Sequence, residues 1–207
     1  MAVVYEQMSR TFTLADSQTL DDLQVFLARA ARMEEGSVRL IAGSGVLAVY
    51  TAILYPVGLL DESPTVLGLR TVALAANADG AADEFDVVVP IRSLLTRLES
   101  VQAARAADSS IQGAATISLP MEVNTVTWAA ISPPRGGWHP IEATTGPLLD
   151  RTARAGIDEV AAAIPDAVGE QIVRRVRSEV WARPIPGLEH VPAGAAFAAL
   201  GLGFLGD

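Results

Sequence analysis

The stretch that decides the fold reads LIAGSGVLAVYTAILYPVGLL at residues 40–60 and holds no charged side chain. About 20 apolar residues are enough to cross a bilayer, so length alone would allow a membrane-spanning helix here. The stretch is, however, interrupted by Gly-Ser-Gly at residues 43–45, is rich in β-branched residues, and meets a proline at Pro56. This pattern is typical of two strands joined by a tight turn. We therefore expect a hairpin, with strands over residues 37–42 and 46–55, and no membrane span.

The elements around this hairpin alternate between helical and strand patterns. Apolar residues recur at helical spacing between Leu20 and Met33, and Ser17 or Thr19 is available to cap the free amides of that helix. Strand patterns follow the hairpin at residues 66–75 and 85–89. The sequence therefore predicts that one helix precedes the hairpin and two strands follow it.

The second half of the chain repeats a similar order before it becomes helical. A helix is predicted over residues 91–107, strands over 114–119 and 125–131, and then two further helices. Thr145 is a candidate cap for the first of these helices. Proline is tolerated at a helix start and not in its interior, so Pro165 is expected to open the second.

These patterns together predict an α+β fold with largely antiparallel sheets covered by helices and a helical C-terminal part. The order helix, strand, strand, proline occurs over residues 20–56 and again over 91–133. This echo indicates either a duplicated α-β-β unit or the chance recurrence of a common order. Small polar residues before residue 114 favour an N-terminal α+β lobe over residues 1–107 and a C-terminal α+β lobe over 114–207. One continuous domain is the alternative.

The composition excludes several kinds of chemistry. The chain has 15 basic residues, all of them arginine, no cysteine and 2 histidines, His139 and His190. It therefore lacks a Schiff-base lysine, a thiol nucleophile and sulfur ligands for zinc. The histidines are too far apart in sequence to give a metal-ligand spacing, and Gly43 and Gly45 lack the third glycine of a dinucleotide fingerprint. We expect no metal and no cofactor.

The charge balance bears on partners and compartment. With 24 acids the formal net charge is -9, which disfavours nucleic acid because phosphate binding depends on cationic side chains. No secretory signal pattern is visible between Met1 and Arg10. We expect a cytoplasmic protein that binds neither nucleic acid nor membrane.

The densest group of chemically versatile residues is SPPRGGWHP at residues 132–140. It offers a guanidinium at Arg135, a flat aromatic surface at Trp138 and an imidazole at His139, with Glu142 nearby. These groups suit an anionic small molecule or one that carries a ring. The alternative is a packing loop in which Trp138 folds over the core and Arg135 is solvated. No serine or threonine is marked by its spacing as a nucleophile, so we expect no catalytic residue.

Two further segments could serve binding. The last helical segment carries Arg174, Arg175 and Arg177 beside glutamates, which favours a salt-bridged solvent face over a basic surface for an acidic partner. The tail over residues 193–206 is uncharged and apolar. It is expected to dock, either into its own domain or against another subunit.

Four stretches, FLARAAR at residues 26–32, VLGLR at 66–70, SPPRGGW at 132–138 and AGAAF at 193–197, resemble a type of conserved hypothetical protein of actinobacteria. The resemblance implies a bacterial cytosolic setting, and it brings no activity and no functional residue with it.

The functional hypothesis follows by subtraction. Since no catalytic set, metal cluster or cofactor fingerprint is found, we expect a non-enzymatic protein that binds a partner protein or associates with itself through apolar surface. The competing hypothesis is a small-molecule binding protein or an enzyme that uses the loop with Arg135, Trp138 and His139.

Overall fold

The computed structural model divides the chain into two units, and each unit is assembled from three separate segments. Unit 1 comprises residues 1–31, 35–50 and 69–124, and unit 2 comprises residues 32–34, 51–68 and 125–207. The structure describes residues 10–34, 36–58, 60–76, 83–108, 110–111, 113–124, 126–130, 133–134, 136–141, 143–164 and 169–206. The fold is α+β with antiparallel strand pairs, as predicted.

The hairpin lies in a four-stranded sheet. Strands β2 (Ser37–Gly43) and β3 (Val46–Leu54) are neighbours in this sheet. Between them Ser44 and Gly45 have φ values of 52° and 76°, the left-handed conformation that two-residue hairpin turns require. The hairpin prediction is confirmed. Among the described residues, no helix has the length and apolar character that a membrane crossing would need.

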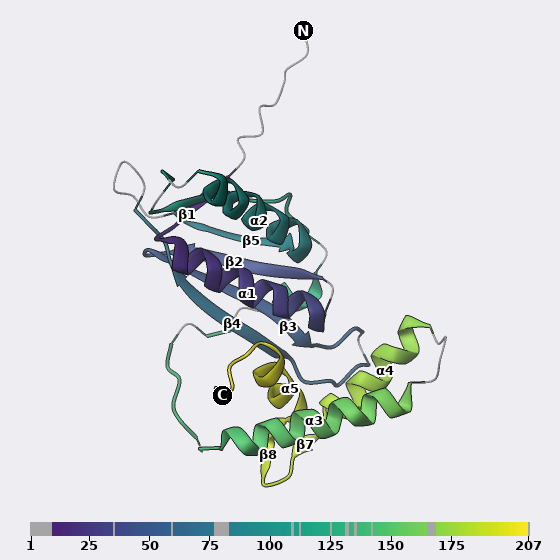
Figure 1. The fold of residues 1–207 in the computed structure, drawn as a ribbon. Helices are drawn as coiled ribbons and strands as arrows, with labels where there is room; N and C mark the ends of the chain where they lie inside the picture. Colours follow the sequence, from purple (N-terminus) through teal and green to yellow (C-terminus); the bar gives the residue numbers. More distant parts are fainter. Residues whose placement is uncertain are drawn as a thin grey trace. The chain divides into compact units, whose positions relative to one another are not determined.

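The sheet brings together strands that are distant in sequence. Its order is β4 (Val66–Ala73), β3, β2, β5 (Phe85–Pro90), as Figure 1 shows. β2 and β5 pair antiparallel, so that Val38 faces Val89 and Leu40 faces Val87. All four of these side chains are buried, which places them in the core of unit 1.

Helix α1 (Ser17–Met33) packs by the predicted apolar face, and its buried residues are Leu20, Leu23, Phe26, Leu27, Ala30 and Ala31. Its cap is not the predicted one. The Thr19 amide donates to Asp16 Oδ1 at 2.7 Å, so Asp16 takes the capping role expected of Ser17 or Thr19. This backbone bond lowers the pKa of Asp16. Arg70 Nε of β4 donates to Asp22 Oδ2 at 2.8 Å and joins α1 to the sheet.

Helix α2 (Ile91–Ala107) follows β5 without a connecting residue and confirms the predicted second helix. It buries Ile91, Leu94 and Leu98. A short strand that the sequence did not reveal, β1 (Thr11–Leu14), pairs antiparallel with β6 (Ala115–Ser118). The partners are about a hundred residues apart, so no local pattern indicates this pair.

One predicted strand is wrong. Residues 127–130, expected within a strand over 125–131, form the 3-10 helix η1 (Thr127–Ala130). The Ala129 amide donates to the Val126 carbonyl at 3.3 Å, and the resulting tight turn buries Trp128. β6, the strand expected to pair with this segment, pairs with β1. Because this second strand is missing, the structure does not show a duplicated α-β-β unit.

Unit 2 contains the predicted C-terminal helices α3 (Gly146–Ala163) and α4 (Glu170–Trp181) and a small antiparallel pair, β7 (Pro184–Ile185) and β8 (Leu188–Pro192). Thr145 caps α3 by accepting from the Leu148 amide, as predicted. The prediction that α4 opens at Pro165 is wrong. Its N-cap is Gly169, and Pro165 lies outside the described residues.

The core of unit 2 forms around Trp181, whose ring stacks on Phe197 with centroids 4.3 Å apart and planes 13° from parallel. Phe197 lies in α5 (Ala193–Gly201). A Cβ at Gly156 of α3 would overlap the Trp181 ring, so only glycine allows this close approach. α5 and Leu202, which follows it, are packed within the chain, and Leu202 lies against Gly68. The tail was expected to dock either into its own domain or against another subunit, and in the structure it docks within its own chain.

Candidate functional site

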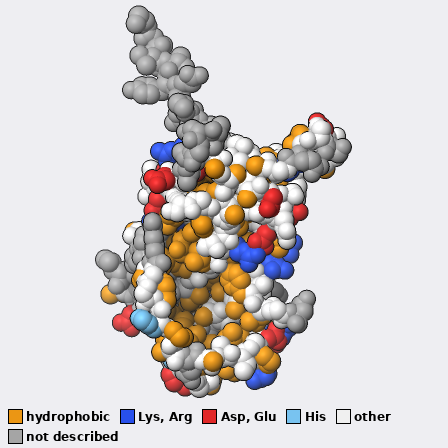
Figure 2. Space-filling view, turned by 90° about the vertical axis from the view of Figure 1, so that its left-hand side faces the viewer, with side chains coloured by type: hydrophobic (Ala, Val, Ile, Leu, Met, Phe, Trp, Pro, Cys, Tyr) orange, Lys and Arg blue, Asp and Glu red, His pale blue; other side chains and the backbone are white. Residues whose placement is uncertain are grey.

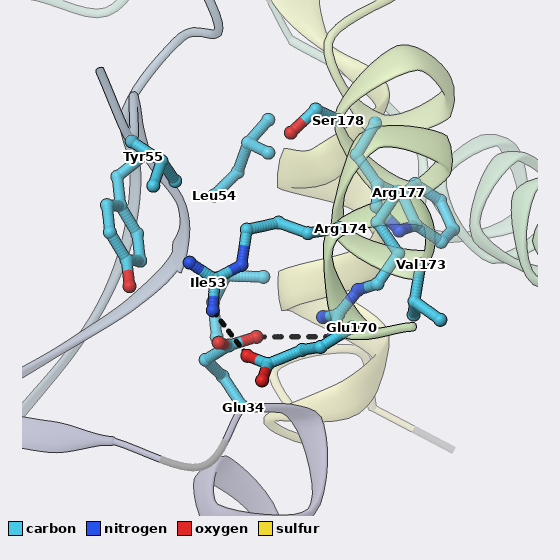
Figure 3. Close-up of a pocket in the computed structure, with 11 residues that line it drawn as sticks. Glu34, Ile53, Leu54, Tyr55, Glu170, Val173, Arg174, Arg177 and Ser178 are labelled. Carbon is cyan, nitrogen blue, oxygen red and sulfur yellow. Dashed lines mark hydrogen bonds and ion pairs between the residues drawn. The ribbon is translucent and has the colours of Figure 1, made fainter. Parts of the chain in front are cut away.

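Two adjoining depressions lie along α4, and all their lining residues belong to unit 2. The inner cavity measures about 80 Å³ and is shown in Figure 3. Its walls come from the end of β3, from Glu34 and from one side of α4. It is lined by Glu34, Ile53, Leu54, Tyr55, Val57, Glu170, Val173, Arg174, Arg177, Ser178 and Trp181.

The firmest charged contact in the inner cavity belongs to Arg177. Its guanidinium pairs with Glu34 Oε2 at 3.2 Å and donates to the Met33 carbonyl at 3.0 Å. The Arg177 and Glu34 side chains are only 26% and 25% exposed. Met33 is the last residue of α1, where a cation is favoured by the helix dipole. Arg177 therefore holds the chain together here and has little freedom to bind a ligand.

Arg174 is bound much more weakly. Its single described ion pair joins Nη2 to Glu170 Oε1 at 2.7 Å, one turn away on α4, and the two side chains are 43% and 82% exposed. Exposed pairs of this spacing contribute about 0.3 to 0.5 kcal/mol. In Figure 3 the carboxylates of Glu34 and Glu170 lie between the guanidinium groups of Arg174 and Arg177. The cavity thus carries balanced charge, and only the Arg174 pair is easily opened.

Tyr55 follows β3 directly and forms the opposite wall of the inner cavity (Figure 3). Burial raises the pKa of its hydroxyl above the ordinary value of 10.0, and the nearby carboxylate of Glu34 raises that pKa further. The phenol therefore stays neutral near pH 7 and can donate a hydrogen bond, but it does not supply a base.

The outer groove is the second depression, with a volume of about 1430 Å³. It runs between α4 and the loop after β3. It is lined by Val57, Gly58, Leu60, Asp61, Glu62, Ser63, Glu170, Gln171, Arg174, Arg175, Ser178, Glu179 and Ala182.

Asp61 shapes the loop side of the outer groove. Its carboxylate accepts from the Val57 amide at 2.8 Å and from the Ser63 amide at 2.9 Å. Hydrogen bonds from the Ser63 side chain and from these amides lower the pKa of Asp61. The loop is therefore held by its own carboxylate, and the side chains on either side of Asp61 are left to face outward.

Those outward side chains are apolar and acidic. Leu60 is 97% exposed, Val57 is half exposed, and Glu62 is exposed without an ion pair in the described part of the chain. On the helix side Arg175 pairs with Glu179 at 2.9 Å, a second exposed pair of one-turn spacing. An apolar anchor and a charged rim thus occur together in this groove.

Apolar exposure is not confined to the groove. Figure 2 shows another face of the molecule, on which hydrophobic side chains gather in one area with charged side chains around it. Met121 in unit 1 is also largely exposed. The outer groove is therefore distinguished by its combination of apolar and charged residues and not by apolar exposure alone.

The two linings, made of residues that the structure describes, carry hydroxyl, carboxylate and guanidinium groups and no histidine. Within the ranges that the structure describes, no group of three or more metal-ligating side chains comes together.

The binding residues predicted from the sequence, around residues 132–142, do not line either depression where the structure describes them. Trp138 is 71% exposed, and its indole nitrogen donates to the Pro134 carbonyl at 3.0 Å. The alternative that Trp138 packs over the core is therefore wrong. His139 is exposed as well, while Arg135 and Glu142 lie outside the described residues. Neither Trp138 nor His139 lines the inner cavity or the outer groove.

Sequence reasoning missed the residues that do line these depressions. The salt-bridged face predicted for α4 is confirmed by the Arg174 and Arg175 pairs, and this was the one signal available. The spacing of Arg174 and Arg177, three residues apart on a helix, places both on one face. Nothing in the sequence connects them to Glu34 or Tyr55, which are more than a hundred residues away.

Comparison with known families gives two matches. A domain of unknown function (DUF8010) matches residues 8–118, and a second domain of unknown function (DUF8185) matches residues 133–207. No curated protein and no solved structure matches the chain.

Proposed function

Because the chain belongs to the DUF8010 family, a family of unknown function, we propose a role from the geometry of unit 2: a non-enzymatic module whose outer groove binds a segment of a partner protein. The observation that carries this proposal is Leu60, a leucine 97% exposed at the side of a groove. Burying a fully exposed leucine against a partner contributes about 1.5 to 3 kcal/mol to binding. Leu60 and Val57 are the natural anchors for such a segment.

The charged residues of the groove support binding and not catalysis. Arg174 and Arg175 are each held by one exposed ion pair, so a partner can rearrange them at little cost. Charged rims around an apolar centre are the usual anatomy of protein interfaces. Glu62, which has no ion pair within the described ranges, adds a further contact point.

The setting that we propose is the cytoplasm of an actinobacterium. A cysteine-free chain suits a reducing compartment, and the resemblance of the four stretches quoted above supports the source. Self-association is part of the same proposal, because exposed apolar side chains also occur outside the groove. Light scattering over a range of protein concentrations tests it, and a monomer at every concentration would count against it.

The groove is tested by selecting a library of random 12-residue peptides on the wild-type chain and on Leu60→Ser. We expect families of peptides that are enriched on the wild type and lost on the variant. Met121→Ser, an equally drastic change at an exposed apolar residue of unit 1, is the matched control and should retain them. If Leu60→Ser retains every family that the wild type selects, the groove is not a binding site.

The loop with Arg135, Trp138 and His139 remains a second candidate because the exposed indole of Trp138 leaves an aromatic face available for stacking. Inorganic phosphate and citrate serve as anionic probes. We expect either anion to raise the melting temperature of the wild type and not of Arg135→Ala, while the unliganded melting temperatures agree. Equal stabilisation of both proteins would remove this candidate.

A further inference from the structure

We infer that the segment bound in the outer groove is basic, with an aliphatic side chain placed between Lys or Arg residues. This inference rests on the proposed function, because it names the chemistry of the partner for the same groove. Two features of the lining support it, the surplus of carboxylates and the exposed carboxylate of Glu170.

Carboxylates outnumber guanidinium groups in the groove. Asp61, Glu62, Glu170 and Glu179 face only Arg174 and Arg175. Asp61 is occupied by its loop amides, and Glu62 has no ion pair among the described residues. Since opposite charge steers association and like charge opposes it, the surplus of carboxylates favours a cationic segment. The formal net charge of -9 acts in the same direction at longer range.

The two ion pairs along α4 differ in which partner is the more exposed. Glu170 is 82% exposed against 43% for Arg174, so an incoming cation reaches this carboxylate before it meets the guanidinium. In the second pair Arg175 is 82% exposed against 58% for Glu179, so a cation reaches Glu179 fully only when Arg175 moves aside. Glu179 lies nine residues further along α4, about 13 Å along the helix axis. Two cations spaced by roughly four residues in an extended segment span that distance.

The apolar part of the groove supplies the second element of recognition. Leu60 and Val57 lie beside Glu62 in the same loop, so an aliphatic side chain of the segment can cover them while its basic neighbours contact carboxylates. A second copy of this chain fits poorly as the occupant, because its own groove carries the same surplus of negative charge. A basic segment of a different protein fits this chemistry.

The test uses one fluorescein-labelled peptide from the family that wild type enriches, titrated by fluorescence anisotropy. We expect Lys or Arg to be enriched beside an aliphatic residue. Glu62→Gln and Glu179→Gln should each weaken binding about two- to fivefold, the usual size for a rim charge. Arg175→Gln should tighten binding because it releases Glu179. Glu99→Gln, at an exposed glutamate of α2, is the matched control and should have no effect.

The direction in which each substitution changes the affinity for the peptide distinguishes a basic partner from an acidic one. If the enriched peptides carry Asp or Glu, or if Arg175→Gln weakens binding while Glu62→Gln strengthens it, the inference is overturned although the groove is still a binding site. Raising the salt concentration from about 50 to about 500 mM should weaken binding of the basic peptide, and no salt effect also overturns the inference. A separate result would contradict the proposed function itself. If Leu60→Ser binds the peptide with unchanged affinity, the groove is not the binding site.

Discussion

Two regions of unit 2 that both include residues of helix α4 differ in packing. Trp181, the last residue of α4, is 2% exposed, stacks on Phe197 and leaves no room for a side chain at Gly156. Arg174 and Arg175, in the middle of α4, face a groove whose far wall carries Leu60. The first region buries its largest aromatic side chain and the second leaves a leucine in water. We therefore expect stability and binding to depend on different residues of the same helix.

The largest expected effect on stability lies in the packed region around Trp181. Trp181→Ala removes a buried ring and its stacking on Phe197, and should lower the free energy of unfolding by about 3 to 5 kcal/mol. Gly156→Val should also destabilise, because its side chain would overlap the Trp181 ring. Urea denaturation followed by circular dichroism measures both. A loss below about 1 kcal/mol for Trp181→Ala would mean that this region is not the core of unit 2.

Arg177 should give an intermediate effect because it lines the inner cavity but is held by Glu34 and the Met33 carbonyl. Arg177→Ala removes the pair with Glu34 and the bond to the Met33 carbonyl, and should cost about 1 to 3 kcal/mol in urea denaturation. Arg175→Ala, which loses only an exposed pair, should change stability by less than about 0.5 kcal/mol. Equal losses for the two variants would contradict the distinction between structural and accessible arginines.

Tyr55 lines the inner cavity, and its raised pKa should make the stability of the protein depend on pH. Because its pKa is raised in the folded protein, the folded state holds the phenolic proton more tightly than the unfolded chain. The stability that this provides is complete below pH 10.0 and is lost as the pH rises through that value towards the folded pKa. Between about pH 9 and about pH 11, Tyr55→Phe should therefore lose less stability than the wild type. A parallel decline in both proteins would remove Tyr55 as a cause.

The smallest effects on stability are expected at the exposed side chains. Leu60→Ser and Trp138→Ala should each shift the free energy of unfolding by less than about 0.5 kcal/mol, since neither side chain is covered. The same Leu60→Ser change should abolish peptide binding. A stability loss above about 1 kcal/mol for Leu60→Ser would show that Leu60 packs within the chain, and the contrast between the packed region and the groove would fail.

The sequence predicts the parts of this fold that local patterns control. The α1 periodicity, the hairpin and the Thr145 cap are all set by residues within a few positions of one another, and the structure confirms them. The hairpin could be distinguished from a membrane span because Gly45 permits the left-handed turn. The predicted strand at residues 127–130 fails because strand formation depends on a distant partner, which no local pattern supplies.

The candidate site was harder to predict for the same reason. Arg174 and Arg177 were recognised only as members of a charged helix face. Their partners Glu34 and Tyr55 come from segments that the fold, and not the sequence order, brings to α4. Leu60 is the last residue of the uncharged stretch at residues 40–60 and lies beyond the predicted strands, so its exposure became visible only in three dimensions.

The interleaving of the two units has a consequence for work with fragments of the gene. Residues 51–68 belong to unit 2 although they lie within the stretch matched by the first family, and residues 133–207, matched by the second, do not include them. A truncated protein that begins after residue 124 would lack Leu54, Tyr55 and Leu60, and with them one wall of the groove. Cloning boundaries taken from the family matches would therefore cut through a folding unit, whereas a clone that spans both matched stretches carries all the parts of the groove.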